Sequence, residues 1–252
     1  MNAWRMVPAA DLEQSETSRC SSMRRESGLI STTMHSLTWS MVKAYLALWH
    51  GLKMEGMEHL PAEPPFVMVA NHCSHLDALV LGAALPERLR DVVFPLAAGD
   101  VFFSSSSRAI CAAKMLNALP MWRKRCGVHA LADLRRRLLE EPCAFILFPE
   151  GGRSRDGKMM PFKPGIGMLV AGTNVPVVPC FIEGAYQALR PGGFVPTRAP
   201  IRLRIGTPLR FADVTNEREG WSEVGQTARD AVERLGNLKD PAPQMESGLP
   251  MI

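Results

Sequence analysis

The chain has 252 residues, of which 46% are hydrophobic, and this suits one sizeable buried core rather than a disordered protein. Its net charge is only +4 and no basic run is interleaved with aromatic residues, so we expect no nucleic acid among its partners, whereas an anionic lipid surface is compatible. The six cysteines are dispersed without a Cys-x-x-Cys pair, which argues against a structural zinc site or a disulfide framework.

The first 52 residues divide into a polar tail and an apolar helix. Residues 1–28 lack the apolar stretch of a signal peptide and are predicted to be a disordered tail, which favours a cytoplasmic location. Residues 29–52 are predicted to form an amphipathic interfacial helix, because tryptophan, tyrosine and lysine suit the headgroup level of a membrane. Polar residues interrupt this segment, so it is not expected to span a bilayer. The alternative is a helix packed on a soluble core.

A short apolar run at residues 66–70 predicts a buried strand, and two polar residues of catalytic type follow it. His72 stands at the strand end, and Asp77 is near enough along the chain to fold back onto its imidazole. Such a pair is typical of a general base, because the carboxylate fixes the histidine tautomer and stabilises the imidazolium. The alternative is a histidine that caps a helix, with Asp77 as a solvated first-turn residue.

The rest of the chain alternates between helices and strands. Helices are predicted near residues 77–85, 107–116, 128–140, 165–172 and 222–236, and strands near 92–96, 143–148, 175–181 and 201–205. The last strand alternates strictly and is expected to be half exposed. The fold class is therefore α/β, a single domain over residues 53–238 with a largely parallel central sheet flanked by helices, followed by a loose tail at 239–252. In such sheets, sites gather beyond the carboxyl ends of the strands.

The loop after the third predicted strand has the composition of an anion site. Gly151 and Gly152 allow a tight turn with its amides close to a ligand. Arg153 and Arg155 supply planar, permanently charged groups suited to phosphate. Glu150 is open to two roles, orienting an arginine or hydrogen-bonding a ligand hydroxyl. The alternative for the whole segment is an ordinary surface turn.

Two further basic residues fit the same anion-binding face. Arg123 stands in a cluster of three cations after a proline turn at Leu119 and Pro120. Lys163 precedes a glycine-rich helix start. Both are candidates for holding an anion, and the alternative for each is a solvated surface residue.

Together these segments resemble the glycerophospholipid acyltransferases, in particular the 1-acyl-glycerol-3-phosphate acyltransferase family, over roughly residues 50 to 210. The likeness rests on four blocks: Asn71-His72 with Asp77 resembles the catalytic His-x4-Asp, Met121–Arg123 the second block, Phe148–Ser154 the acceptor-binding loop, and Val175–Pro179 a strand-and-proline element. Two departures concern the acceptor side. Gly152 stands where the family usually has threonine or serine, and Asn117–Pro120 stand where it has a glycine and a more aliphatic stretch.

The resemblance implies an enzyme that transfers an acyl chain from acyl-CoA or acyl-carrier protein to the free hydroxyl of 1-acyl-glycerol-3-phosphate, giving phosphatidic acid. The resemblance also implies that the catalytic residues are His72 and Asp77. The substrate-binding residues that it implies are Arg123, Glu150, Gly151, Arg153 and Lys163. No metal and no cofactor are expected. The implied location is the cytoplasmic face of the cell membrane, as a peripheral or monotopic protein.

Other interpretations stay open. The same chemistry could act on a lyso-ornithine lipid, another lysophospholipid or glycerol-3-phosphate. Cys73 could be a thiol nucleophile paired with a histidine, or His72, Cys73, His75 and Asp77 could bind a metal. A non-catalytic module that binds anionic lipid would need the basic loop and the 29–52 helix but not the His-Asp pair.

Overall fold

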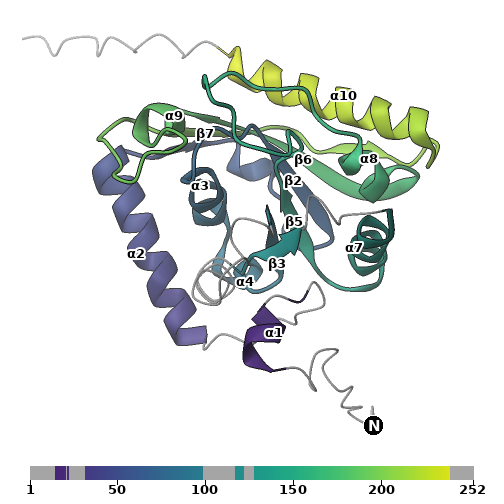
Figure 1. Ribbon diagram of the computed structural model, residues 1–252, viewed down its shortest axis with the longest axis horizontal. Helices are drawn as coiled ribbons and strands as arrows, with labels where there is room; N and C mark the ends of the chain where they lie inside the picture. Colours follow the sequence, from purple (N-terminus) through teal and green to yellow (C-terminus); the bar gives the residue numbers. More distant parts are fainter. Residues whose placement is uncertain (1–14, 21, 23–31, 99–116, 122–127, 239–252) are drawn as a thin grey trace, which may run out of the picture.

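The computed structural model describes residues 15–20, 22, 32–98, 117–121 and 128–238 (Figure 1). Its helices are α1 (Glu16–Cys20), α2 (Thr32–His50), α3 (Asp77–Ala84), α4 (Glu87–Arg90), α7 (Val128–Glu140), α8 (Gly165–Val170), α9 (Ala185–Ala188) and α10 (Arg218–Gly236), with a 3-10 turn η1 (Met57–His59). Its strands are β1 (Lys53–Glu55), β2 (Phe66–Ala70), β3 (Val93–Ala98), β4 (Leu119–Met121), β5 (Ala144–Leu147), β6 (Thr173–Glu183), β7 (Arg202–Ile205) and β8 (Leu209–Phe211).

One sheet organises the molecule, and it is mostly parallel. The strand order is β1-β7-β6-β2-β5-β3-β4, with β8 added beside β6. Only the β6–β7 and β6–β8 pairs are antiparallel among the described strands. The predicted α/β class with a largely parallel central sheet is therefore confirmed.

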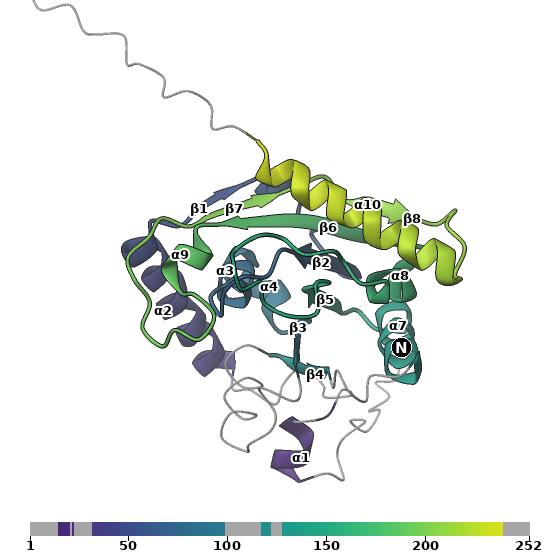
Figure 2. The same ribbon diagram turned by 45° about the horizontal axis from the view of Figure 1, so that its top comes forward.

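Helices cover both faces of this sheet, and each face has its own apolar core. Alternate residues of β2 divide between the faces, so Phe66, Met68 and Ala70 pack with α3 and α9, whereas Val67 and Val69 pack with α7, α8 and α10. Figure 2 shows α10 and α8 on one side of the sheet, and α2 and α3 on the other. Every residue of β2 is buried, as expected for a central parallel strand covered on both faces.

The longer predicted elements are present, and the shortest ones were missed. The predicted strand at 66–70 and helix at 128–140 are β2 and α7. The elements β1, β8, α4 and α9 have only three or four residues, too few for a period to show in the sequence. The predicted helix at 107–116 lies outside the described residues. Helix α1 lies within the segment predicted to be a tail.

Two local predictions were wrong. Leu119 and Pro120 were predicted to form a turn, but they belong to β4, which pairs in parallel with β3. An edge strand tolerates a proline because one side of it needs no ladder hydrogen bonds. The strand at 201–205 was expected to be half exposed, but Arg204 is only 4% exposed. Its guanidinium is paired with Glu55 and Glu183 at 3.3 and 3.2 Å, which explains how a charged residue is accommodated there.

Candidate active site

The two loops singled out by the sequence lie side by side because their strands are neighbours. β2 and β5 are parallel and adjacent, with Val69 opposite Leu147. The carboxyl ends of both strands therefore open at the same edge of the sheet. The loops are also bonded to each other directly, since the backbone N–H of Ser154 donates to the carbonyl of His72 at 2.8 Å.

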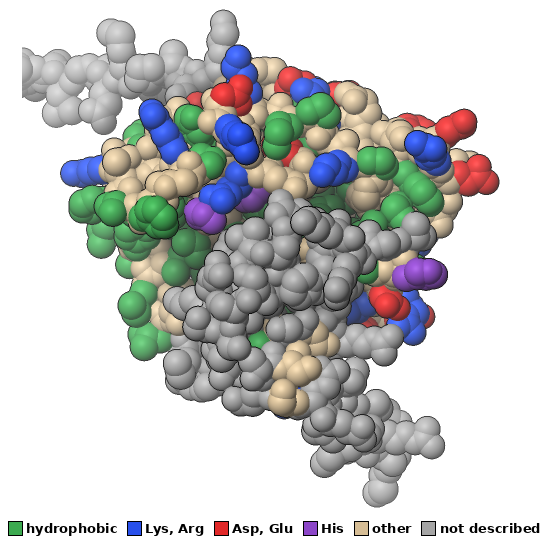
Figure 3. Space-filling view, in the orientation of Figure 1, with side chains coloured by type: hydrophobic (Ala, Val, Ile, Leu, Met, Phe, Trp, Pro, Cys, Tyr) green, Lys and Arg blue, Asp and Glu red, His purple; other side chains and the backbone are tan. Residues whose placement is uncertain are grey.

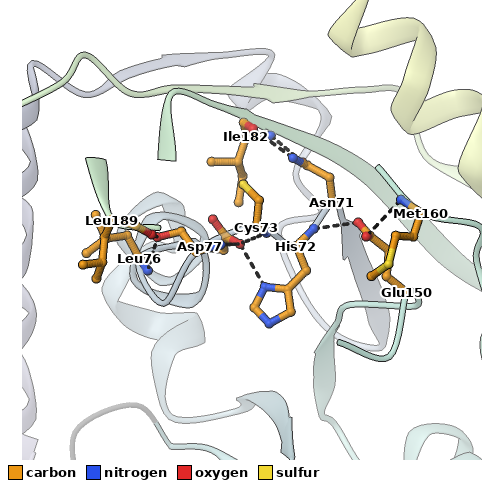
Figure 4. A network of polar contacts seen from close by, with 10 residues as sticks. Asn71, His72, Cys73, Leu76, Asp77, Glu150, Met160, Ile182 and Leu189 are labelled. Atoms are coloured by element: carbon orange, nitrogen blue, oxygen red, sulfur yellow. Dashed lines mark hydrogen bonds and ion pairs between the residues drawn. The ribbon is translucent and has the colours of Figure 1, made fainter. Parts of the chain in front are cut away.

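His72 and Asp77 are in contact (Figure 4). Nδ1 of His72 lies 2.9 Å from Oδ2 of Asp77. The Asp77 side chain is fully buried, whereas the His72 side chain is 21% exposed. The other ring nitrogen, Nε2, has no hydrogen-bond partner among the described residues, and Figure 4 shows it directed away from Asp77. This geometry rules out the solvated first-turn alternative for Asp77 and leaves one nitrogen of a carboxylate-bonded imidazole open to a ligand.

The Asp77 carboxylate is fixed by the turn that precedes it. Oδ2 also accepts hydrogen bonds from the backbone N–H groups of Cys73 and Ser74, at 2.7 and 2.8 Å. Asp77 is the first residue of α3, where the positive end of the helix favours a negative charge. Its second oxygen, Oδ1, is buried and has no protein partner within the described chain.

The backbone of His72 is anchored by Glu150, a residue of the second loop. Oε1 of Glu150 accepts the N–H of His72 at 2.7 Å, and Oε2 accepts the N–H of Met160 at 3.0 Å. Glu150 is only 4% exposed. Burial raises the pKa of this carboxyl to about 7, although the two backbone hydrogen bonds act in the opposite direction. The carboxylate thus joins the histidine segment to the turn that follows the arginine loop.

Two contacts to the histidine segment were not anticipated from the sequence. The Asn71 side chain donates to the carbonyl of Ile182 and accepts its N–H, at 2.9 and 2.8 Å, so it extends the pairing of β2 with β6. The Phe148 ring stacks on the imidazole of His72, with ring centroids 4.1 Å apart and planes inclined by 18°. Both residues stood inside the recognised motifs, but nothing in their spacing indicated these roles.

Arg153 presents an unsatisfied donor beside the His-Asp pair. Its Nη1 atom is buried and has no hydrogen-bond partner in the described part of the chain. Burial lowers the pKa of Arg153, and the charge of Asp77 raises it. The pKa of His75 is lowered by burial and, next, by the charge of Arg153. The guanidinium therefore interacts with this acidic and imidazole cluster, and one of its donors has no partner within the described residues.

Lys163 and Gly151 lie against each other in the same loop. The N–H of Lys163 donates to the carbonyl of Pro149 at 2.9 Å. Gly151 has a φ of 73°, and a Cβ atom placed on it would collide with the Lys163 ammonium group. Only glycine suits both the left-handed backbone and this close approach. Gly152 differs, since a Cβ there would meet nothing within 4 Å.

The remaining candidates separate clearly. Arg123 lies outside the described residues. Burial, with the charges of Asp77 and Glu150, raises the pKa of the Cys73 thiol, so this group is a poor nucleophile at neutral pH.

Within residues 15–20, 22, 32–98, 117–121 and 128–238, no three His, Cys, Asp or Glu side chains gather as metal ligands. In the same part of the chain, no helix has both the length and the apolar character needed to cross a bilayer.

Comparison with known proteins identifies a family and several relatives. Residues 51–183 match the protein family described as Acyltransferase. The chain is 31% identical to 1-acyl-sn-glycerol-3-phosphate acyltransferase alpha of Mus musculus over 142 residues, 55% of this chain and 47% of that protein. It is 27% identical to the 1-acyl-sn-glycerol-3-phosphate acyltransferase of Limnanthes douglasii over 179 residues, 68% of this chain and 59% of that protein. The chain thus spans about half the length of the curated relatives that it matches.

The fold also has a counterpart among solved structures. The crystal structure of PlsC, the 1-acyl-sn-glycerophosphate (LPA) acyltransferase of Thermotoga maritima, superposes with a TM-score of 0.60 and 24% identity. The match covers 83% of each chain. At that identity the superposition establishes a shared fold.

Proposed function

The chain belongs to the Acyltransferase family, and from that premise we propose that it transfers an acyl chain from a thioester to the free hydroxyl of 1-acyl-glycerol-3-phosphate, giving phosphatidic acid. The names of its relatives support this acceptor. The observation on which the proposal rests is the His72–Asp77 contact, with Nε2 of the imidazole open and with Arg153 in electrostatic interaction with Asp77. The donor that we propose is acyl-CoA or acyl-carrier protein.

In the proposed reaction His72 acts as the general base. Nε2 removes the proton of the acceptor hydroxyl as its oxygen attacks the thioester carbonyl. The tetrahedral intermediate then collapses, the C–S bond breaks, and the leaving thiolate takes this proton from the imidazolium. Asp77 holds Nδ1 and stabilises the charged ring. Help of this kind is typically worth about 10²–10⁴-fold in rate.

Arg153 and Lys163 would bind the acceptor phosphate in this proposal. The buried Nη1 of Arg153, which has no partner among the described residues, is suited to a phosphate oxygen, and the exposed Lys163 ammonium over Gly151 adds a second positive charge. Holding the phosphate fixes the position of the reacting hydroxyl, which is the usual contribution of a binding group to rate. Arg123 remains a proposed partner in this task.

We propose a positioning role for Glu150 in place of direct substrate contact. Both of its oxygens already accept backbone N–H groups, from His72 and Met160. The carboxylate would keep the histidine backbone aligned with the arginine loop, so its loss should reduce turnover more than acceptor affinity.

The decisive experiment measures thiol release from acyl-CoA in the presence of lysophosphatidate. His72→Ala should abolish release while the variant keeps the wild-type circular-dichroism spectrum. Cys73→Ala is the matched control, and it should stay active because its thiol is protonated and buried. Near-normal turnover of His72→Ala would end the proposal, and loss of turnover only in Cys73→Ala would favour the thiol mechanism.

Three other acceptors are also candidates, and one observation favours them. Gly152 leaves open space where the resembled family usually has a hydroxyl side chain, so one contact to the acceptor is missing. The same chemistry on another lysophospholipid, a lyso-ornithine lipid or glycerol-3-phosphate would tolerate this loss. A panel of these acceptors, compared by kcat/KM, separates them from lysophosphatidate. Binding to liposomes without turnover of any acceptor would instead indicate a lipid-binding module.

A further inference from the structure

The segment between α9 and β7 exposes two adjacent apolar side chains. Phe194 is 97% exposed and Val195 is 79% exposed. We name residues 190–200 the 190–200 loop. A single exposed apolar residue is ordinary in a folded protein. Two adjacent exposed apolar residues that lie beside a second apolar surface form a patch, and such patches mark interaction sites.

That second surface is the outer face of α2. Leu37, Met41 and Leu48 are 63%, 63% and 81% exposed, and their spacing places them on one side of the helix. The opposite side faces the core, where Trp39 and Leu46 are buried. The helix is therefore apolar on both faces, and the protein itself covers only the inner one.

Hydrogen bonds connect the 190–200 loop to α2 and to the active site. At its far end, the carbonyl of Ala199 lies 2.9 Å from Nδ1 of His50, the last residue of α2. Immediately before the loop, the carbonyl of Leu189 accepts a hydrogen bond from the hydroxyl of Ser74, at 2.8 Å. Ser74 in turn donates its N–H to Asp77. The loop thus bridges the apolar helix and the catalytic segment.

The charged residues of the 190–200 loop are all basic. Arg190 and Arg198 are exposed in the loop. No acidic residue occurs in α2 or between residues 185 and 200. In Figure 3, hydrophobic side chains continue along the left edge of the molecule, where Figure 1 places α2 and the loop, and basic side chains lie above them. Apolar side chains with flanking cations suit a membrane of negative surface charge.

We infer that the 190–200 loop is a second membrane anchor, which inserts Phe194 and Val195 into an anionic lipid bilayer beside the outer face of α2. Two separated apolar contacts fix an orientation that one helix alone leaves free to roll. Because Leu189, the residue before the loop, is bonded to the catalytic segment, the inserted loop would hold that segment near the lipid surface. The inference rests on the proposed function only for the identity of the lipid substrate.

The test is vesicle sedimentation of the full chain with the double variant Phe194→Ser, Val195→Ser. Both side chains are exposed, so the fold should be unaffected. Partitioning onto vesicles rich in phosphatidylglycerol should fall at least about tenfold, since each lost apolar contact contributes to partitioning. Leu139→Ser is the matched control, because Leu139 is 51% exposed on α7 and should not alter binding. Arg198→Gln should weaken binding to these vesicles but not to vesicles of phosphatidylcholine.

Activity supplies the second measurement. The double variant should keep wild-type thiol release with a short-chain lysophosphatidate below its micellar concentration, and lose activity with lysophosphatidate presented in vesicles. Unchanged vesicle binding of the double variant would overturn the inference, as would an equal fall in Leu139→Ser. A change of oligomeric state without a change in vesicle binding would overturn it too, in favour of self-association. His72→Ala should still bind vesicles like the wild type, so failure of the proposed chemistry and failure of the anchor remain distinguishable.

Discussion

The two sides of the candidate active site are built differently. On the base side, Asp77 and the backbone of His72 are held by four hydrogen bonds of 2.7 to 2.9 Å and by burial. On the phosphate side, a buried nitrogen of Arg153 has no partner within the described residues, and Lys163 is exposed at the surface. The base is organised before any ligand arrives, whereas the phosphate side still has donors to offer.

This contrast has a physical reason. A proton acceptor must hold one tautomer and one orientation throughout the reaction, so its partners belong to the protein. A phosphate-binding group must exchange its partner at each turnover, so its strongest donor stays unpaired until the ligand binds. Substitutions on the base side should therefore lower kcat, and substitutions on the phosphate side should raise KM for the acceptor.

Among substitutions that keep His72, the largest effect is expected for Asp77→Asn. The amide oxygen can take the place of Oδ2, but the side chain becomes neutral, so the imidazolium loses the negative charge that stabilises it. The amide NH2 group would occupy the buried position of Oδ1, which has no partner within the described residues. We expect kcat for thiol release to fall by about 10²–10⁴-fold with little change in KM. Asp156→Asn is the control, since this exposed carboxylate serves only the local turn at Ser154 and Lys158. A near-normal kcat for Asp77→Asn would show that the carboxylate does not assist the base.

Arg153→Lys should give the next largest effect, and it should appear in KM. Lysine keeps the positive charge but loses the planar group that can place two donors on one phosphate. One lost charge-assisted hydrogen bond corresponds to about ten- to hundredfold in KM for lysophosphatidate. Arg136→Lys is the control, because it makes the same arginine-to-lysine change on the surface of α7, away from the site. It should leave kcat and KM unchanged. If KM stays unchanged in Arg153→Lys while kcat falls, Arg153 supports the base rather than the phosphate.

The sequence predicted the base side better than the connections between loops, for reasons that particular residues make clear. The contact of His72 with Asp77 depends on five residues of chain and a strand end, both of which are visible in the sequence. The bond from Glu150 to the His72 N–H joins residues far apart in the chain, and it exists only because β2 and β5 are neighbours. Local composition does not determine strand order. Glu150 was therefore predicted to bind substrate, and its hydrogen bond to the His72 backbone was not predicted. The hydrogen bond from the Asn71 side chain to the Ile182 carbonyl could not be predicted for the same reason.

Glu150→Gln should separate these roles through pH. The carboxyl of Glu150 has a pKa of about 7 in the folded protein, above its ordinary value of 4.5, because it is buried. When pH falls through about 7, the group is protonated, one of its two backbone hydrogen bonds is lost, and activity should decrease. In Glu150→Gln, the decrease of activity that comes from protonation of this group should be absent from the pH profile. The kcat of this variant should already be lowered at neutral pH, while its KM for lysophosphatidate stays near normal. A raised KM with normal kcat would instead indicate contact with the acceptor.

The pH dependence of stability that comes from Glu150 should be opposite to the pH dependence of activity. Because the folded-state pKa is raised, the folded protein holds more protons than the unfolded chain between pH 4.5 and about 7. The contribution of Glu150 to the free energy of unfolding is therefore greatest at low pH and is lost as pH rises through about 7. The change is on the order of 3 kcal/mol at most. Urea unfolding at pH 5 and pH 8 measures it, and the difference should be smaller by this amount in Glu150→Gln.

The smallest effect is expected for Gly152→Thr, which tests whether the phosphate side lacks a contact. A Cβ at this position meets nothing within 4 Å, and no unusual backbone angle requires glycine there, so the variant should fold normally. The added hydroxyl would offer one neutral hydrogen bond to the acceptor, which should lower KM for lysophosphatidate by about two- to tenfold without changing kcat. Gly151→Thr is the contrasting variant, because it would strain a left-handed residue and displace Lys163. An improvement for another lysolipid but not for lysophosphatidate would show that the natural acceptor is one that position 152 does not contact.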